Sequence, residues 1–397
     1  MQKRSNRFTP VGIMLSLCLS AVMPVTPVWA VEAGGEIEVS FSGALAEDGD
    51  FTDDQFADSL DLEFFLPPLG ETEISYAFRI GHPLQGLTAG KEASYFTKKL
   101  YLRRKFDRFH LTVGRQPVSW SFGSLLNPVD YTLGAVALDE ENNSKYTDAV
   151  EVYTPLNWNS SLSLVTSFPA GFDLEAEKMK WGVRGRFGVK GYDLTVNYVR
   201  EAAVLAGAAA ELTGLREAGG AVGDVAALLP GILPRQRAGF AFKGDLGEIG
   251  FYGAYGHYFG DGVESSNSYL LGADYSYNLN YNTKITMQLE YIGVELNFLE
   301  PAYRTALLKL ESDDDRLDLL AGAFSYPVDD FSTVSLITLV NLDDGSLFLT
   351  PEYQTTLPGN LDLTVNTTVF LGGGGTLLAP GDQLPQVTFC VTLSYPF

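Results

Sequence analysis

The sequence has few of the residues on which disulfide frameworks, metal centres and helical membrane spans depend. Two cysteines occur in the whole chain, Cys18 and Cys390. Because Cys18 falls in a predicted leader peptide, Cys390 would stand alone, which excludes an intrachain disulfide, a CxxCH haem site and a paired-cysteine metal site. After residue 30, no apolar run reaches the roughly 18 residues that a membrane-spanning helix requires.

Histidine and positive charge are also scarce. The three histidines, His82, His110 and His257, have no serine or aspartate tied to them by spacing. The glycine run 372–375 lacks the Lys-Ser/Thr pair that would follow in a phosphate-binding loop. Lys and Arg number 27 against 49 Asp and Glu, which argues against nucleic-acid binding. We therefore expect no catalytic residue, no metal site and no cofactor.

What the chain does have is a strong alternation of apolar and polar residues, most clearly at its end. In 387–397 every second side chain is apolar and the side chains between them are small or polar. A period of two predicts a β-strand with two different faces. A strand that ends on an aromatic residue is typical of transmembrane barrels, whose outer face meets lipid. The ending resembles the signal by which the barrel-assembly machinery selects outer-membrane proteins of diderm bacteria, which Tyr395 and Phe397 would carry.

The same alternation recurs along the chain, from Glu36–Leu45 to the terminal stretch. It predicts about eighteen strands (16–18), although both faces look apolar in Arg316–Tyr326 and Ser332–Asn341. Short connections alternate with longer ones, as do the periplasmic turns and outer loops of barrels. The predicted fold class is therefore all-β: a transmembrane antiparallel up-and-down β-barrel.

Residues 1–30 have the features of a cleaved signal peptide. A basic start precedes an apolar core at Val11–Met23, and small residues stand before the cleavage position after Ala30. The remainder, 31–397, is predicted to be a single barrel domain in the outer membrane of a diderm bacterium. Its two longest loops are 118–148 and 201–234.

Period-two phasing places several basic residues on the inner face of the predicted strands. Acidic residues of the first strands, Glu36, Glu38, Asp61, Glu63 and Glu73, would lie elsewhere on the lumen wall. Such a separation gives a transverse field that orients polar solutes, with a slight preference for anions. Alternatively, the charges sit at strand ends and pair with their neighbours. The predicted pore-lining basic residues are Lys99, Arg103, Lys105, Lys178, Lys180, Arg184, Arg186 and Arg237.

One internal motif resembles a known family. The stretch Gly114-Arg115-Gln116, followed by Trp120 and by Asn127-Pro128 with Asp130, is similar to a motif of porin-like barrels that include alginate-export-type proteins. In that family the loop after this strand folds inward, which implies that 118–148 narrows the pore with Asp139, Glu140 and Glu141. Ser121 replaces the family's usual glycine and Pro117 interrupts the strand, so alginate is not carried over as substrate. The alternative is an exposed outer loop.

The function expected from these features is passive diffusion of small hydrophilic, including anionic, solutes through a water-filled lumen. The expected partners are outer-membrane lipids, the barrel-assembly machinery and the solutes themselves; the sequence does not give the oligomeric state. A barrel sealed by its loops, acting as an adhesin or an assembly element, is the second hypothesis. An outer-membrane lipase or protease is the third.

Overall fold

The computed structural model describes most of the chain after residue 30. The described residues are 31–45, 51–88, 90, 92–118, 137–139, 144–168, 179–200, 236–260, 263–280, 283–295, 316–373, 376–379 and 385–397. The predicted signal peptide and loop 201–234 lie outside them, as does most of loop 118–148. None of the helices in the described residues is long and apolar enough to cross a membrane.

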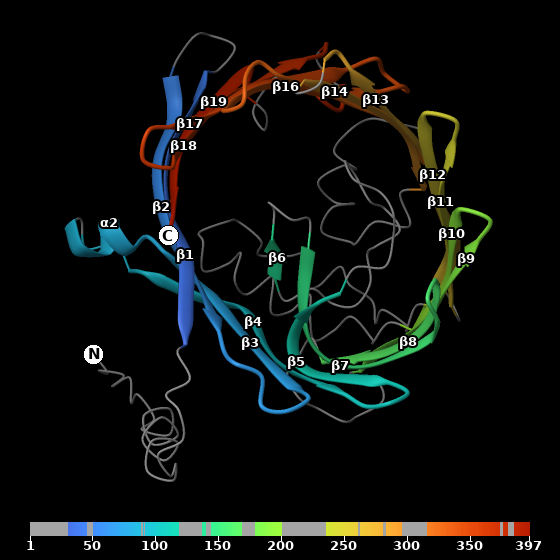
Figure 1. Ribbon diagram of the computed structural model, residues 1–397. Helices are drawn as coiled ribbons and strands as arrows, with labels where there is room; N and C mark the ends of the chain where they lie inside the picture. Colours follow the sequence, from blue (N-terminus) through green and yellow to red (C-terminus); the bar gives the residue numbers. More distant parts are fainter. Residues whose placement is uncertain are drawn as a thin grey trace, which may run out of the picture.

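The strands form a closed antiparallel barrel, which Figure 1 shows along its axis. Eighteen strands close the ring, since β1 pairs with both β2 and β19. A nineteenth, the three-residue β6, pairs only with β7. The strands are β1 (Glu32–Leu45), β2 (Phe51–Phe65), β3 (Thr72–Gly81), β4 (Ser94–Lys105), β5 (His110–Pro117), β6 (Ala137–Asp139), β7 (Ser144–Asn157), β8 (Ser160–Ser167), β9 (Lys180–Val189), β10 (Tyr192–Arg200), β11 (Gln236–Leu246), β12 (Ile249–Gly260), β13 (Val263–Asn278), β14 (Lys284–Glu295), β15 (Arg316–Pro327), β16 (Ser332–Asn341), β17 (Leu347–Leu357), β18 (Leu361–Leu371) and β19 (Val387–Pro396).

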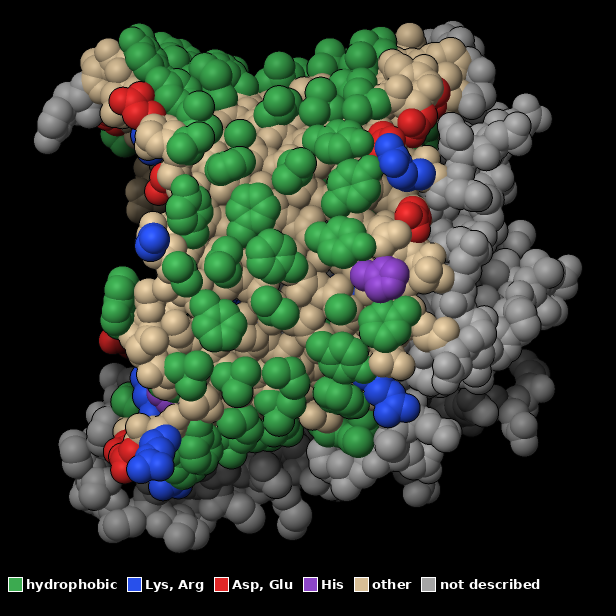
Figure 2. All heavy atoms as spheres, turned by 90° about the vertical axis from the view of Figure 1, so that its right-hand side faces the viewer, with side chains coloured by type: hydrophobic (Ala, Val, Ile, Leu, Met, Phe, Trp, Pro, Cys, Tyr) green, Lys and Arg blue, Asp and Glu red, His purple; other side chains and the backbone are tan. Residues whose placement is uncertain are grey.

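The outer face of the barrel is apolar. Large side chains such as Leu164, Val196 and Leu271 are each about half exposed, and they alternate with buried or polar positions along their strands. Figure 2 shows hydrophobic side chains across the middle of one side of the barrel, with charged side chains near its two ends. An apolar band between charged rims is the surface that a lipid bilayer covers.

The predicted strand count is confirmed, and the errors lie at strand ends. Strand β2 begins at Phe51 rather than at Leu60, because the acidic run before Leu60 still pairs with β1. Strands β7 and β13 also begin earlier than expected, at Ser144 and Val263. The alternation is least clear in these polar starts, so hydrophobic periodicity could not find them.

The connection after β3 contains a short helix that was not predicted, α2 (Pro83–Thr88), which projects outside the ring in Figure 1. Its first turn is anchored on the outward-facing Asp58 of β2. The Leu84 amide donates to Asp58 Oδ2 at 2.5 Å, and Gln85 Nε2 donates to Asp58 Oδ1 at 3.1 Å. This carboxylate is 4% exposed. It therefore satisfies helix donors rather than facing lipid.

The ring closes at the chain ends. The backbone of Phe397 exchanges hydrogen bonds with Gly35, N to O at 2.9 Å and O to N at 3.0 Å. A Cβ on Gly35 would lie 2.8 Å from Phe397 Cζ and 2.4 Å from the carbonyl oxygen of Asp61. The glycine therefore leaves the space in which the terminal ring sits against β1.

Candidate functional site

The inner face of the barrel has two sides that differ in their access to solvent. On strands β8 to β14 many inward-facing side chains are buried, and Val165, Val199, Arg237, Ser268 and Glu290 are each 0% exposed, whereas Arg186 and Lys243 are exposed. On strands β17, β18, β19 and β1 the inward-facing side chains named below all retain access to solvent. Water in the lumen therefore reaches the wall that contains the two ends of the chain.

This accessible wall is built almost entirely from hydroxyl, amide and carboxylate groups, and we call it the hydroxyl wall. Registers with neighbouring strands fix its members, since Asn366 lies opposite both Glu352 and Cys390, and Cys390 lies opposite Ser42. No member is Lys or Arg. The members are Phe348, Thr350, Glu352, Gln354 and Thr356 of β17, Asp362, Thr364, Asn366, Thr368 and Phe370 of β18, Thr388, Cys390, Thr392 and Ser394 of β19, and Glu36, Glu38, Ser40 and Ser42 of β1.

Several members of the hydroxyl wall bond to one another across strands. Thr350 and Thr368 share a hydrogen bond of 2.8 Å, and the Thr356 hydroxyl donates to Asp362 at 2.6 Å. At the end where β16 turns into β17, the rings of Phe348 and Phe370 lie with centroids 5.9 Å apart. The wall therefore combines an aromatic pair at one end with polar groups along its length.

Predicted basic residues on β9 and β11 lie on the inner face, on the far side of the ring from the hydroxyl wall in Figure 1. Registers align Arg184 with Ser163 and Asn197, which are buried inward-facing residues. Arg186 is held by Asp193 at 2.6 Å. Arg237 is 0% exposed, with its guanidinium 5.9 Å from the centre of the Tyr258 ring. Lys180 also faces inward, opposite Ser167 of β8, whereas Lys178 lies outside the described residues.

Predicted basic residues on β4 also face inward, but beside the acids that the sequence phasing placed elsewhere. Lys99 Nζ lies 3.2 Å from Glu63, and Arg103 lies 3.9 Å from Glu73. The separation of an acidic and a basic wall is therefore wrong for these strands. Period two gives the face of a residue but not its neighbour across the sheet, which depends on register.

The inward-facing charges of β2, β3 and β4 form a row. At one end of this row, the carboxylate of Asp61 on β2 contacts two cations. Asp61 receives a bidentate contact from Arg79, with the shortest distance 2.6 Å, and lies 3.0 Å from Lys98 Nζ. Lys98 is a bulge residue, because Ala77 pairs with Lys99 while Phe78 pairs with Thr97. The bulge breaks the alternation of inward and outward side chains along β4. It therefore brings Lys98 to the same carboxylate as inward-facing Arg79.

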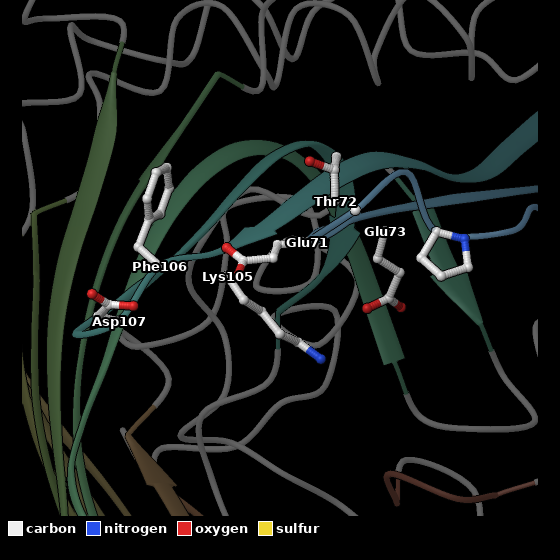
Figure 3. A pocket seen from close by; sticks show the side chains of 8 residues that line it. Glu71, Thr72, Glu73, Lys105, Phe106 and Asp107 are labelled. Carbon is white, nitrogen blue, oxygen red and sulfur yellow. The ribbon is translucent and has the colours of Figure 1, made fainter.

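The opposite end of the row meets a cavity of about 550 Å³ between the β2–β3 and β4–β5 turns. Its lining includes Glu71, Glu73, Lys105, Phe106 and Asp107, whose side chains are shown in Figure 3. The cavity opens at the short-turn end of the barrel and is lined by three acids and one lysine. Predicted pore residue Lys105 therefore lies at a rim rather than at mid-strand.

The motif residues that the structure describes tie three strands together. Arg115 donates to both carboxylate oxygens of Asp148 at 2.8 Å and to the Thr97 carbonyl at 3.1 Å. Gln116 is 1% exposed and donates to the Ala149 carbonyl at 3.2 Å. Gly114 has a φ of 122°, and a Cβ there would lie 2.2 Å from the Leu100 carbonyl oxygen. These contacts join β4, β5 and β7, which is a structural role.

The rest of the resemblance falls largely outside the described residues. Strand β6, which contains Asp139, lies within the outline of the ring when viewed along the axis in Figure 1. An inward fold of loop 118–148 stays a prediction. The motif and loop residues outside the described part of the chain are Trp120, Asn127, Pro128, Asp130, Glu140 and Glu141.

At the end of the barrel with the long loops, hydrogen bonds hold a segment of the last loop beside the barrel opening. Asp344, in the turn between β16 and β17, accepts hydrogen bonds from the Leu377 amide at 2.6 Å and from the Ser346 amide and hydroxyl at 2.8 and 2.6 Å. Burial opposes ionisation of Asp344, but these hydrogen bonds outweigh it and lower its pKa. Leu377 packs against the inward-facing cluster that includes Leu319.

The described residues give no candidate metal centre, and their histidines make local contacts. They contain no group of three His, Cys, Asp or Glu residues placed to hold a metal ion. His257 contacts Asn267 at 2.8 Å, His82 contacts Gln85 at 3.3 Å, and the His110 ring lies against Tyr153. Each histidine thus has a local polar or aromatic contact.

Sequence reasoning missed the hydroxyl wall, although the sequence contains a signal for it. There is no Lys or Arg from residue 317 to residue 397, or from residue 31 to residue 78. These two stretches meet at the closure of the barrel, where β19 pairs with β1. Reading the ends of the chain as neighbours would have predicted one continuous arc of the wall without positive charge.

Comparisons with known proteins identify the fold. No family model matches the chain, and no curated protein matches it in sequence. Solved structures do match over nearly the whole chain. Pseudomonas aeruginosa OccK11 has 9% identity and a TM-score of 0.54, and covers 92% of this chain and 96% of its own. Acinetobacter baumannii OccAB3 has 10% identity and a TM-score of 0.52, covering 93% and 99%.

A third similar structure is Escherichia coli Wzi, described as an outer-membrane protein involved in group 1 capsule assembly and as a carbohydrate-binding β-barrel. It has 14% identity and a TM-score of 0.53, and covers 97% of this chain and 87% of its own. At these identities the likeness shows the fold alone. The chain has the closed-barrel fold of Gram-negative outer-membrane proteins.

Proposed function

We propose that this protein is an outer-membrane channel through which small hydrophilic solutes diffuse passively. The observation that carries the proposal is the contrast between the two faces of a closed ring. The outer face is apolar over its middle, as lipid requires, while one inner wall is polar and accessible to solvent. A polar wall in contact with water inside a lipid-facing barrel supports passage of water-soluble molecules.

The anion preference expected from the sequence has less support than the channel itself. Lys99, Arg103 and Arg186 each lie beside a carboxylate, and Arg237 is buried. A cation paired at short range contributes little field to a solute farther away in salt solution. We therefore propose hydrophilic solutes without a general preference for anions.

A barrel sealed at its mouth, acting as an adhesin or an assembly element, is the second candidate. The burial of inward-facing side chains such as Val165, Arg237 and Ser268 on β8 to β14 favours it, because solvent does not reach these parts of the lumen wall. The similarity to Wzi agrees with this alternative, since that barrel is described as carbohydrate-binding. An enzymatic role has no supporting arrangement among the described residues, and we propose that the protein is not an enzyme.

Single-channel recording of the purified, folded protein in planar bilayers tests the proposal. We expect stepwise conductance from samples that resist SDS until heated, since a closed barrel has no free edge from which to unravel. The control is the same preparation after heat denaturation. Folded protein that inserts into bilayers and never conducts would reject the channel in favour of the sealed barrel.

A further inference from the structure

We infer that the hydroxyl wall forms a track for neutral polyhydroxylated solutes of the sugar class, distinct from any route along the basic residues of β9 to β11. The inference rests on the proposed channel function and specifies its substrate class. It follows from three properties of the wall: its access to solvent, its side-chain chemistry and the aromatic pair at one end.

Access decides which part of the lumen a solute touches. Arg237, Ser163 and Asn197 on the other side are at most 3% exposed, so a solute in the described lumen has little contact with them. The members of the hydroxyl wall on β17 to β19 and β1 all keep solvent access. Selectivity is set by the groups that line the solvent-accessible path, and the hydroxyl wall is a continuous part of that path without a positive charge.

The chemistry of the wall suits hydroxyl groups. Thr364, Thr368 and Thr392 each offer a hydroxyl that both donates and accepts, and Asn366 adds an amide with both capacities. A sugar presents the same alternation of donors and acceptors, so it can exchange hydrogen bonds with water for hydrogen bonds with the wall at little cost. Simple ions cannot use this array in the same way.

The charges of the wall disfavour anions. The charged members of the wall are all carboxylates: Glu36, Glu38, Glu352 and Asp362. They repel an anionic solute, whereas they accept hydrogen bonds from sugar hydroxyls. Two of them accept hydrogen bonds from hydroxyl groups of the protein itself, since the Ser335 hydroxyl donates to Glu352 at 3.4 Å and the Thr356 hydroxyl donates to Asp362 at 2.6 Å.

The aromatic pair gives the track a place to receive the apolar face of a sugar ring. Phe348 and Phe370 face the lumen at the end next to the turn that holds Asp344, opposite each other on β17 and β18. Leu339, opposite Phe348 on β16, extends this apolar surface. Rigid rings beside a few directed polar groups are the usual composition of a small-molecule site.

Three solutes that share one carbon skeleton test the inference: glucose, the anion gluconate and the cation glucosamine. Their entry is measured by swelling of liposomes that contain the folded protein. We expect glucose and glucosamine to enter at similar rates and both to enter several times faster than gluconate. Gluconate entering fastest would overturn the inference, and so would glucosamine entering many times faster than glucose, because charge alone would then govern selection.

A triple substitution tests whether the hydroxyl groups of the wall, rather than the shape of the lumen, favour glucose. The triple variant Thr364→Val, Thr368→Val and Thr392→Val keeps side-chain volume while removing three hydroxyls. We expect glucose entry relative to that of a small ion to fall by about threefold or more. The matched control is Thr367→Val on the lipid-facing side of β18, opposite Phe389, which should leave glucose entry unchanged.

The outcomes distinguish the two proposals. If none of the three solutes enters liposomes containing SDS-resistant, heat-modifiable protein, the channel function fails. If all three enter at equal rates, and the triple variant behaves like Thr367→Val, the channel stands and the sugar track is overturned.

Discussion

The hydroxyl wall and the inner face of β8 to β14 are built by the same alternation and differ in what their inward side chains meet. On β8 to β14 inward positions include Leu270, Ile292 and Tyr252, which form a buried cluster. On the hydroxyl wall most inward positions are threonine, serine, amide or carboxylate side chains in contact with solvent. A barrel lumen can therefore be a packed interior on one side and a wet surface on the other, with one strand pattern serving both.

The comparison also separates stability from selectivity. Buried apolar side chains on β11 to β15 contribute packing energy, as in a soluble core. Polar side chains on the hydroxyl wall contribute little stability, because they exchange one set of hydrogen bonds for another with water. We therefore expect substitutions on the two sides to affect different measurements.

The largest expected effect comes from disrupting the pairing of β1 with β19, on which the hydroxyl wall depends. Gly35→Val places side-chain atoms where the Phe397 ring and the Asp61 carbonyl already lie. We expect most of the protein to lose its SDS-resistant form, because β1 and β19 could not pair at the end of the chain. Gel mobility before and after heating measures this.

Gly373→Ala is the control for Gly35→Val, since a Cβ at residue 373 meets nothing within 4 Å. It should retain the SDS-resistant band. If Gly35→Val folds as well as Gly373→Ala, the terminal ring is not positioned by this glycine.

The next effect is on packing and sharpens the difference between the two sides. Leu270 is 1% exposed within the buried cluster. Leu270→Ala should reduce the free energy of unfolding by about 2–5 kcal/mol, through lost burial and the cavity left behind. Thr392→Ala on the hydroxyl wall should change it by less than about 1 kcal/mol. Urea unfolding of both variants in the same detergent gives the comparison, and equal losses would contradict it.

The smallest effect concerns the hydrogen bonds that hold a segment of the last loop beside the hydroxyl wall. The pKa of Asp344 is lowered, so its hydrogen bonds to Leu377 and Ser346 contribute stability that is present above the unfolded value of about 4. That contribution is lost as pH falls through the lowered pKa of the folded protein. We expect Asp344→Asn at neutral pH to weaken the contact by about 1 kcal/mol.

Hydrogen exchange at the Leu377 amide measures this contact, since that amide donates to Asp344 at 2.6 Å. The variant should exchange several times faster than the wild type at the same pH. Asp330→Asn, in the turn at the opposite end of β16, is the control. Equal exchange in all three proteins would show that Asp344 does not hold the loop.

Much of the fold could be predicted because the alternation is local. The terminal strand Val387–Pro396 and its partner β18 were correctly placed from apolar residues at every second position. The start of β2 at Phe51 was missed, because its polar residues pair with β1 through the backbone without an apolar pattern. Lys98 was missed because a bulge breaks the period.

The candidate site was predicted less well, for a reason that Lys99 and Arg103 illustrate. Their inward direction follows from phasing, and the structure has them inward. Their partners, Glu63 and Glu73, were placed on another wall, since strand order in an up-and-down barrel gives the neighbouring strands but not the register that brings two side chains together. The pore-lining roles of these residues stay predictions.

The sequence by itself determined that this protein is a barrel with an apolar outer face, because a period of two assigns each side chain to one of two faces without any knowledge of tertiary contacts. It also contained the absence of positive charge after Arg316 and from residue 31 to residue 78. Only the tertiary structure decided that these two stretches form one wall, since closure pairs β19 with β1. It also decided that water reaches this wall and not inward side chains such as Val165, Arg237 and Ser268, because exposure depends on how the whole chain packs.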